Sequence, residues 1–401
     1  MNDASITYIP ITDILGKANG STQAVDGGAR LLNDVHGFLG RFVAYSSPDA
    51  QLAHCLWIAH THIMDAWEST PRIAFLSPEP GSGKTRALEV SELLVPRPVE
   101  AVNVTPAYLF RKVGSEGGPP TILFDEIDTV FGPKAKDNEE IRGLLNAGHR
   151  RGAVAGRCVV RGKIVETEEI PAYCAVALAG LGDLPDTILS RSIIVRMRRR
   201  APGEQIEPFR RRVHAPEGHE LRERLAAWAL NIVAVATEAR PAMPEGIEDR
   251  NADIWEALLA VADIAGGDWP HRSRVAAVTL VTLAREANPS LGIRLLADLR
   301  IVFGDKNVMA TDAILSSLNN LPESIWNEIS GGKALNDRGV ASRLRKFGIK
   351  PKVVRIGDTT ARGYARDELF DAWSRYLGTP TMEDVTTVTS VTAAPCAPVH
   401  D

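Results

Sequence analysis

The stretch SPEPGSGKTRALEV, residues 77–90, decides the fold of this 401-residue chain. It follows the short apolar run Ile73–Leu76, whose Ser-Pro ending is typical of a buried strand that stops abruptly. After the glycines, residues 85–94 repeat apolar side chains at helical spacing. A strand, a glycine-rich loop and a helix in this order predict a loop whose backbone N–H groups face an anion at the positive end of the helix.

The loop departs from the usual phosphate-binding pattern at one position, because Pro78 stands where the first glycine is expected. A proline also turns the chain through its fixed φ, so we still predict an ATP site. The Lys84 ammonium is expected to reach the β- and γ-phosphates and the Thr85 hydroxyl to hold Mg²⁺. The alternative is a chance Gly-Lys-Thr in a flexible loop, which the flanking strand and helix weaken. The loop residues predicted to bind the nucleotide are Gly81, Ser82, Gly83, Lys84 and Thr85.

A second apolar run, Thr121–Phe124, ends in the two carboxylates Asp125 and Glu126. Such a strand suits a Mg²⁺-ATP site at the carboxyl edge of a sheet. We expect Asp125 to orient Mg²⁺ through its water shell and Glu126 to polarise the attacking water. Surface strands also end in acids, but the glycine-rich loop makes that reading the weaker one. The sequence therefore predicts ATP hydrolysis.

The segment GDLPDTILSRSIIVRM, residues 182–197, resembles the part of AAA+ ATPases that carries the arginine finger. This resemblance implies that Arg191 reaches the γ-phosphate bound by a neighbouring subunit of a homo-oligomer. A structural arginine packed on a helix end is the alternative. AAA+ proteins usually carry a polar sensor residue about twelve residues earlier, where this chain has Ala179, so that residue is absent or moved.

Residues 202–304 have the helical pattern of the lid that closes over the nucleotide in AAA+ proteins. In that family an arginine near the start of a lid helix contacts the γ-phosphate. Arg250 occupies a comparable place, although Arg272 and Arg274 compete for the role. The basic runs 196–200 and 210–212 are interpreted first as a solvated face and second as a DNA or subunit contact.

The stretch AVAGRCVVRGKIVETEEIPAYC, residues 153–174, predicts a β-hairpin with Gly162 in a tight turn. Its position resembles that of the hairpin which hexameric AAA+ helicases, such as the minichromosome maintenance type, project into a central channel. The tip residues Arg161 and Lys163 are then expected to contact a nucleic-acid backbone. A surface hairpin with incidental charge is the alternative, and three glutamates on its second arm would repel phosphate.

The region from about 311 to 377 predicts helices followed by two strands around Gly357-Asp358, the pattern of a winged helix. From residue 333 to 377 there are eleven Lys or Arg against five Asp or Glu. A basic helix over 339–347 favours duplex DNA binding, and a protein-docking winged helix is the alternative. The predicted DNA contacts of this region are Arg338, Arg343, Arg345, Lys346 and Lys350.

Composition limits the remaining classes. The net charge is −4, so nucleic-acid contact must come from local basic patches. The four cysteines have no metal-ligand spacing, and no apolar run approaches the roughly 20 residues that span a bilayer. We expect a cytoplasmic protein without membrane contact. His54, His60 and His62 are expected to be packing and surface histidines rather than metal ligands.

The chain also resembles, over most of its length, a domain family of phage and prophage proteins that are often fused to or encoded beside primase modules. The stretches that carry this resemblance are STPRIAFLSPEPGSGKTRALE, NAGHRRGAVAGR, LPDTILSRSIIVRMRRR, RNADIWEALLAVADIAGGDWP and TARGYARDELFDAWSRYL. The resemblance implies a link with DNA replication in mobile elements and a primase or another replication protein as partner.

These observations predict an α/β P-loop core of the AAA+ type with a helical lid, an N-terminal helical element and a C-terminal winged-helix domain. The expected function is an ATP-hydrolysing, oligomeric DNA motor, helicase-like and in the form of a hexamer. The two alternatives are a DNA-bound ATPase switch or loader without unwinding, and a DNA-binding regulator whose ATP site controls assembly. The expected parts are the N-terminal element at 1–70, the core at 71–200, the lid at 201–305, the winged helix at 306–377 and a disordered tail at 378–401.

Overall fold

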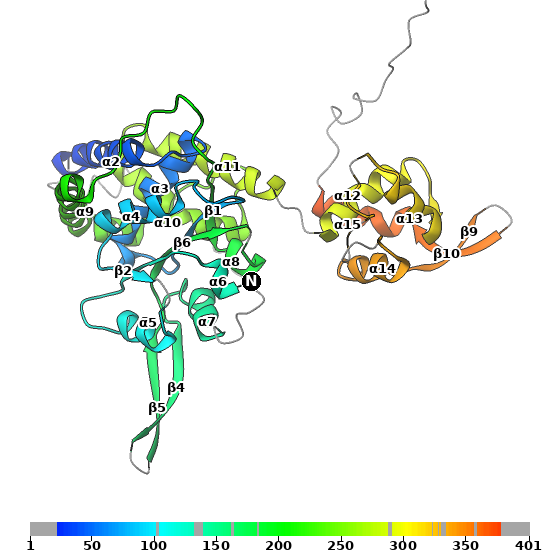
Figure 1. Cartoon of the computed structure of the whole chain (residues 1–401), viewed down its shortest axis with the longest axis horizontal. Coiled ribbons are helices and arrows are strands. Elements are labelled where there is room, and N and C mark those ends of the chain that lie inside the picture. Colours follow the sequence, from blue (N-terminus) through cyan, green and yellow to red (C-terminus); the bar gives the residue numbers. More distant parts are fainter. Residues whose placement is uncertain are drawn as a thin grey trace, which may run out of the picture. The chain divides into compact units, whose positions relative to one another are not determined.

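The computed structural model divides the chain into two compact units, residues 1–284 and 285–401 (Figure 1). This division lies before the predicted boundary at 305/306, so the last helix expected in the lid belongs to the second unit. The predicted disordered tail lies outside the described residues, as do the side chains of 22–26, 157–166 and 287. The structure describes residues 22–101, 104–131, 139–161, 164–182, 184–287, 291–322, 324–327, 329, 334–356 and 359–377.

The first unit is built on a five-stranded sheet in which every pair of neighbours is parallel. In β1, Ile73 and Phe75 face one hydrophobic core while Ala74 and Leu76 face another, because successive side chains of a strand point to opposite faces. The sheet is therefore covered on both sides, as parallel sheets generally are. The order is β2 (Pro98–Ala101), β3 (Thr121–Phe124), β6 (Ala175–Leu181), β1 (Arg72–Ser77) and β7 (Ser192–Arg196).

The first core joins the predicted N-terminal element and lid helices to one face of the sheet. The residues of helix α3 from Leu52 to Thr61 are all buried. It packs against its neighbours on several sides, which include the helix that follows the glycine loop. The helices of this side are α2 (Thr22–Phe42), α3 (Pro48–Thr61), α4 (Lys84–Leu94), α9 (Arg211–Glu238) and α10 (Asp249–Ala265). The same unit contains η1 (Met64–Ala66) and most of α11 (Trp269–Ala287), which crosses the boundary at residue 284.

The second core fills the opposite face of the sheet and is bounded by short helices. Thr105 caps the first of them through its hydroxyl, which accepts a hydrogen bond from the Tyr108 amide, as the Thr-Pro pair predicts. The helices of this side are α5 (Pro106–Val113), α6 (Asp128–Phe131), α7 (Glu139–Ala147) and α8 (Asp186–Leu189).

His54 and His60 of α3 are buried packing residues, and His62 at the C-terminal cap of the helix is partly buried. His54 joins two elements, since its Nδ1 lies 2.7 Å from the Tyr45 hydroxyl and its Nε2 lies 2.8 Å from the Ser91 hydroxyl on α4. His60 contacts Thr70, and His62 contacts a backbone carbonyl at the end of α4. Burial lowers the pKa of His54 and His60 to about 3 and that of His62 to about 4. In their neutral form, these histidines therefore hold α3 against the segments that it contacts.

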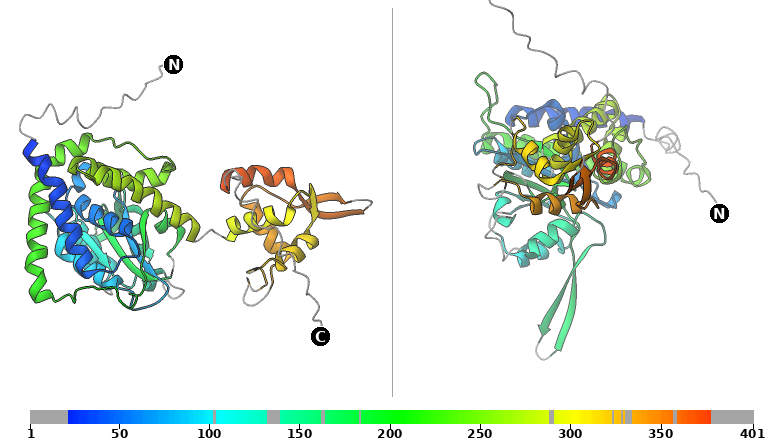
Figure 2. Two further views of the ribbon diagram at one scale, coloured as in Figure 1. Left: turned by 90° about the horizontal axis from the view of Figure 1, so that it is seen from above. Right: turned by 90° about the vertical axis from the view of Figure 1, so that its right-hand side faces the viewer.

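The predicted hairpin is present as β4 (Val154–Arg161) and β5 (Ile164–Pro171), paired antiparallel from Val154–Pro171 to Arg161–Ile164. Its second arm packs against α5, and the hairpin projects away from the five-stranded sheet of its unit (Figures 1 and 2). Lys163 lies outside the described residues, and so does the side chain of Arg161. Their predicted DNA contacts therefore stay predictions.

The second unit combines helices with a small antiparallel sheet of order β8-β10-β9. Its core is anchored by two tryptophans, because the Trp326 indole donates to Asp298 at 2.6 Å and that of Trp373 to the Leu296 carbonyl at 2.9 Å. A Cβ at Gly363 would lie 2.1 Å from the Met309 carbonyl, so only glycine fits where β10 pairs with β8. The elements are α12 (Leu291–Phe303), β8 (Val308–Ala310), α13 (Thr311–Asn319), α14 (Asp337–Arg345), β9 (Lys352–Ile356), β10 (Thr359–Ala365) and α15 (Arg366–Tyr376).

The two strands predicted between 353 and 364 are confirmed as β9 and β10, and the basic helix corresponds to α14. The sequence reading did not include β8, and it had assigned α12 to the lid. None of the helices in the described part of the chain is long and apolar enough to cross a membrane.

Candidate functional site

A pocket of about 460 Å³ opens at the carboxyl edge of the parallel sheet. We call it the loop pocket, and we call residues 78–83 the glycine loop. Because β6 lies between β1 and β3, the ends of these three strands are adjacent. The pocket is lined by residues 80–85 after β1, by Asp125 and Glu126 after β3, and by Gly180 and Leu181 of β6. The structure therefore brings together both groups of residues predicted from the sequence.

The glycine loop reaches α4 through two glycines in the left-handed region. Gly81 has a φ of +76° and Gly83, the N-cap of α4, has a φ of +85°. Any other residue at these positions would be strained. The first amides of a helix have no partner inside it, so the loop delivers unpaired N–H groups and the positive helix end to the pocket. This arrangement favours an anion.

The ammonium of Lys84 lies over the glycine loop. It donates to the Ser77 hydroxyl, to the Ser82 hydroxyl at 3.2 Å and to the Glu79 carbonyl at 3.4 Å. Burial lowers the pKa of Lys84, while the nearby charges of Asp125 and Asp128 act in the opposite direction. The cation is thus held by neutral oxygens and is positioned to exchange them for an anion.

Thr85 and Asp125 meet across the pocket. The Thr85 hydroxyl donates to Asp125 Oδ2 at 2.9 Å, and Asp125 Oδ1 accepts from the Glu126 amide at 2.9 Å. A hydroxyl and a carboxylate oxygen are hard ligands of the kind that Mg²⁺ takes when phosphates complete its shell. Among the described residues, no group of three or more His, Cys, Asp or Glu side chains could hold a metal ion by itself. The pair therefore fits a metal that arrives with a phosphate ligand.

Glu126 has a positive φ of +54° although it is not a glycine. Neighbouring hydrogen bonds hold this backbone, since the Ile127 amide donates to the Ala179 carbonyl at 2.9 Å and the Thr129 amide to the Glu126 carbonyl at 2.9 Å. Such strain costs on the order of 1–3 kcal/mol and persists where surrounding structure imposes it. The side chain is exposed at the rim of the pocket, where water reaches it.

Asp128 is a pocket residue that the sequence reasoning missed. Its Oδ1 accepts a hydrogen bond from the Leu181 amide at 3.1 Å, which ties the start of α6 to the end of β6. Ala179, where a polar sensor residue was expected, is fully buried and does not line the pocket. The signal for Asp128 was the third acid in Asp-Glu-Ile-Asp.

Arg199 is a second missed residue. Its Nε donates to the Pro80 carbonyl at 3.1 Å, and it lies 3.9 Å from the position of a Cβ on Gly81. The basic run 196–200 had been interpreted first as a solvated face. Arg199 is exposed, as that interpretation expects, and it also contacts the glycine loop, which the sequence spacing between the two segments could not reveal.

Arg191 lies at the opposite, amino edge of the sheet. It directly precedes β7, in which Ser192 pairs with Arg72 at the start of β1. β1 is six residues long, and at about 3.3 Å per residue its two ends lie about 17 Å apart. The Arg191 guanidinium donates to the Thr187 carbonyl on α8. It therefore does not line the loop pocket of its own chain.

Arg250 was expected to contact the same nucleotide as Lys84, but the structure does not bring the two together. Its Nη1 donates to the Ser190 hydroxyl at 3.2 Å, and it lines a small pocket with Arg191. The competing candidates do not line the loop pocket either. Arg272 stacks on the Trp269 ring, and Arg274 pairs with Asp263 at 2.6 Å.

In the second unit the predicted DNA contacts gather on α14 and the turn after it. Asn336 caps the helix by accepting from the Gly339 amide at 2.8 Å, and Val340 and Leu344 bury its inner face. Arg343 is half-buried and donates to the Gly339 carbonyl at 3.0 Å. The exposed basic side chains of this surface, which we call the α14 face, are Arg338, Arg345, Lys346 and Lys350.

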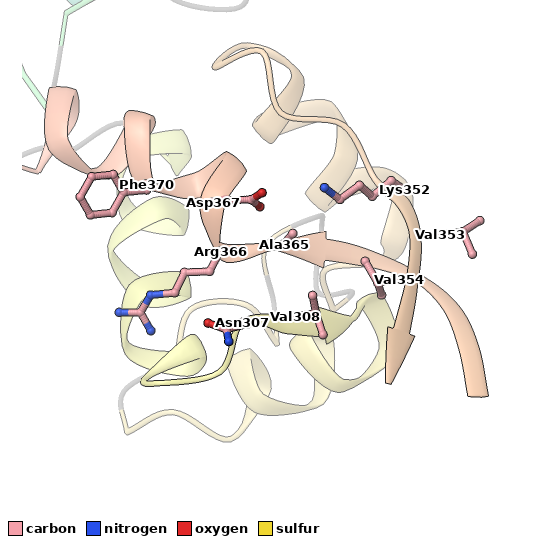
Figure 3. Close-up of a pocket in the computed structure, with 9 residues that line it drawn as sticks. All are labelled: Asn307, Val308, Lys352, Val353, Val354, Ala365, Arg366, Asp367 and Phe370. Carbon is pink, nitrogen blue, oxygen red and sulfur yellow. The ribbon is translucent and has the colours of Figure 1, made fainter. Parts of the chain in front are cut away.

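A further pocket of about 630 Å³ lies between β9 and α15 (Figure 3). Lys352 at its edge pairs with Glu368 at 3.1 Å. Phe370 is 66% exposed beside it, while Val353 points away from the other labelled side chains. The predicted DNA contacts of α14 do not line this pocket, and its geometry indicates no particular ligand.

Comparison with known proteins adds two matches. The family described as "Protein of unknown function (DUF3631)" matches residues 196–376, which include Arg250 and α14 but not the glycine loop. The "Uncharacterized 28.9 kDa protein in xis 5'region" of Saccharopolyspora erythraea is 45% identical over 182 residues, which cover 45% of this chain and 68% of that protein. At this identity and coverage, the chain belongs to the family of that Saccharopolyspora protein.

Proposed function

We propose that the protein is an ATP-hydrolysing, oligomeric DNA motor of the AAA+ type, helicase-like, that serves the replication of a phage or mobile element. The observation that carries the proposal is the loop pocket, where the glycine loop, Lys84 and the Thr85–Asp125 pair meet. Glu126 completes the set at the rim. This is the arrangement that binding and hydrolysis of a nucleoside triphosphate require.

The residues of the pocket fit Mg²⁺-ATP. The loop amides and Lys84 would bind the phosphates, and Thr85 with Asp125 would hold the metal. When bound, Mg²⁺ supplies neutralisation of the phosphate charge. Asp125 also positions the Glu126 backbone through its second oxygen, so that the Glu126 carboxylate is available to accept a proton from water.

The AAA+ assignment is supported by the arrangement of the sheet. One strand, β6, separates the strand of the glycine loop from the acidic strand, and β7 lies on the other side of β1. The glycine loop and the acids therefore lie at one edge of a parallel sheet, as the resemblance to AAA+ proteins implies. Arg191 lies beyond the reach of its own loop pocket, which agrees with a finger that serves a neighbouring subunit.

The DNA component is supported by the second unit, whose helices, β9–β10 hairpin and basic α14 face agree with a winged helix. The projecting β4–β5 hairpin is a second candidate contact. A role in mobile elements is supported by the resemblance to phage and prophage proteins and by a relative named for the xis 5' region.

One assay tests the proposal: steady-state ATPase with and without single-stranded DNA, alongside native mass measurement with and without ATP. We expect Mg²⁺-dependent turnover, stimulation by DNA and a larger assembly in ATP, with Lys84→Ala inactive because it binds ATP weakly. Absence of turnover would contradict the proposed ATPase activity and favour a DNA-binding regulator. Turnover without strand displacement on a forked substrate would favour a switch or loader.

A further inference from the structure

Two arginines from separate elements meet in one small pocket at the amino edge of the sheet. The pocket has a volume of about 80 Å³, and we call it the arginine pocket. Arg191 lies between the C-cap of α8 and the start of β7, and Arg250 lies in the first turn of α10. The Ser190 hydroxyl accepts a hydrogen bond from Arg250 Nη1 at 3.2 Å. The Ser190 hydroxyl thus holds the Arg250 side chain in the same pocket as Arg191, the next residue in the chain after Ser190.

The arginine pocket carries excess positive charge. Within the described residues, neither Arg191 nor Arg250 forms an ion pair, and Asp253 is the acidic side chain of the lining. The fully buried Arg72 nearby donates to the backbone carbonyls of Cys174 and Leu145. Burial, then Arg72 and then Arg191 lower the pKa of His149, which also lines the pocket. Such a site favours an anion.

The backbone beside Arg250 is held in an unusual conformation. Asp249 has a φ of +50° at the start of α10, and among the described non-glycine residues only Arg97 and Glu126 share a positive φ. Strained residues of this kind gather at functional sites. Two of the three therefore lie at or next to residues of the two pockets.

The anion cannot come from the loop pocket of the same chain, because the two pockets open at opposite edges of the sheet. The lining of the loop pocket is rich in acid, since Asp125, Glu126 and Asp128 contribute three carboxylates against the ammonium of Lys84. Arg199 reaches the glycine loop but is not part of this lining. Charge that develops on a transferred phosphoryl group needs arginine or metal nearby. The arginine pocket would add two guanidinium groups to this acidic lining.

We propose that Arg250 acts together with Arg191 as a two-arginine clamp on the γ-phosphate of the nucleotide held in the loop pocket of a second copy of the chain. This inference rests on the proposed ATPase function. It differs from the expectation that Arg250 contacts the nucleotide of its own subunit.

A mixing experiment separates these two roles. Arg250→Ala protein alone should lose at least tenfold in kcat, in line with loss of one donor to a developing charge. Mixed with Glu126→Gln protein, it should regain activity, because one subunit then supplies both arginines and the other supplies an intact Glu126. If Arg250 acted within its own subunit, no site in the mixture would be complete and activity would stay low.

The controls keep failure of this inference distinct from failure of the ATPase proposal. Arg224→Ala removes an exposed ion pair with Asp34, neither of which lines either pocket, and should keep wild-type turnover. Arg250→Lys, which retains charge without the planar fork, repeats the mixing test should the alanine variant melt early. Inactive wild type would overturn the ATPase itself. Active wild type, with either full activity of Arg250→Ala or a mixture that is not restored, would overturn the clamp alone.

Discussion

The two units of the chain use charge in different ways. In the first unit, charged side chains from distant segments converge on two pockets at opposite edges of one sheet. In the second unit, basic side chains spread along the exposed side of α14 and the following turn. The first arrangement positions a few atoms within hydrogen-bond distance of one another. In the second, several exposed charges together produce a positive electrostatic potential.

The difference predicts how each unit responds to change. In a pocket where groups converge, the loss of one side chain should remove a catalytic function that no neighbouring residue can replace. On a surface where charges act together, the loss of one charge should lower the affinity for DNA only by the contribution of that charge. The net charge of −4 for the whole chain therefore does not show that the two units arrange their charged side chains differently.

The largest effect should come from the loop pocket. Glu126→Gln should retain ATP binding, because Lys84, Thr85 and Asp125 remain, and should lose about 10²- to 10⁴-fold in hydrolysis with the general base. Equilibrium binding of a fluorescent ATP analogue and steady-state turnover measure the two properties separately. Glu116→Gln, an exposed glutamate that does not line the loop pocket, is the matched control. Equal turnover of Glu126→Gln and wild type would remove Glu126 from the chemistry.

Much of the first unit could be predicted from the sequence, because its signals are local. The run Ile73–Leu76 before the glycines, the acids after Phe124 and the Thr-Pro cap of α5 each specify an element through a short pattern. Parallel strands then bring their carboxyl ends to one edge, so the loop and the acids were expected to meet. The placement of Lys84, Thr85 and Asp125 follows from these rules.

The errors arise where position depends on long-range packing. The contacts of Arg250 and Arg199 join residues 60 and 119 positions away, Ser190 and Pro80, which no local pattern encodes. α3 buries polar as well as apolar side chains, among them His54 and His60, and no local pattern shows that other segments would enclose them. Likewise α12 has an apolar stripe that suits either unit, and only its contacts with α13, α14 and α15 assign it.

An effect of intermediate size is expected from acid, which should lower the stability of the first unit more than that of the second. The pKa values of His54, His60 and His62 are lowered from 6.5 to about 3 or 4, so the folded state binds fewer protons than the unfolded state. Their stabilisation is complete above pH 6.5 and is lost as pH falls toward 4. Between pH 6.5 and 5 the first unit should lose about 2 kcal/mol per histidine.

The described part of the second unit contains no histidine, so this cause of acid sensitivity does not apply to it. Chemical unfolding of the full chain at pH 5, 6 and 7 measures the contrast through two transitions. His54→Gln should lower overall stability yet flatten its dependence on pH, because one titrating group is gone. An unchanged slope for this variant would show that His54 is not the source of the sensitivity.

The smallest effect should come from single changes on the α14 face. Lys346→Ala should weaken duplex binding only a few-fold and should reduce the slope of log affinity against log salt by about one, because one phosphate contact fewer releases one counterion fewer. Arg375→Ala is the matched control, since this exposed arginine on α15 is already paired with Asp371 at 2.8 Å. Fluorescence anisotropy with a labelled duplex from 50 to 200 mM salt resolves both. If Lys346→Ala left the slope at the wild-type value, the duplex would have to contact another surface, and the basic residues 196–200 and 210–212 of the first unit would be the next to test. The contrast between convergent and summed charge would then fail, because the chemistry and the DNA contact would share one unit.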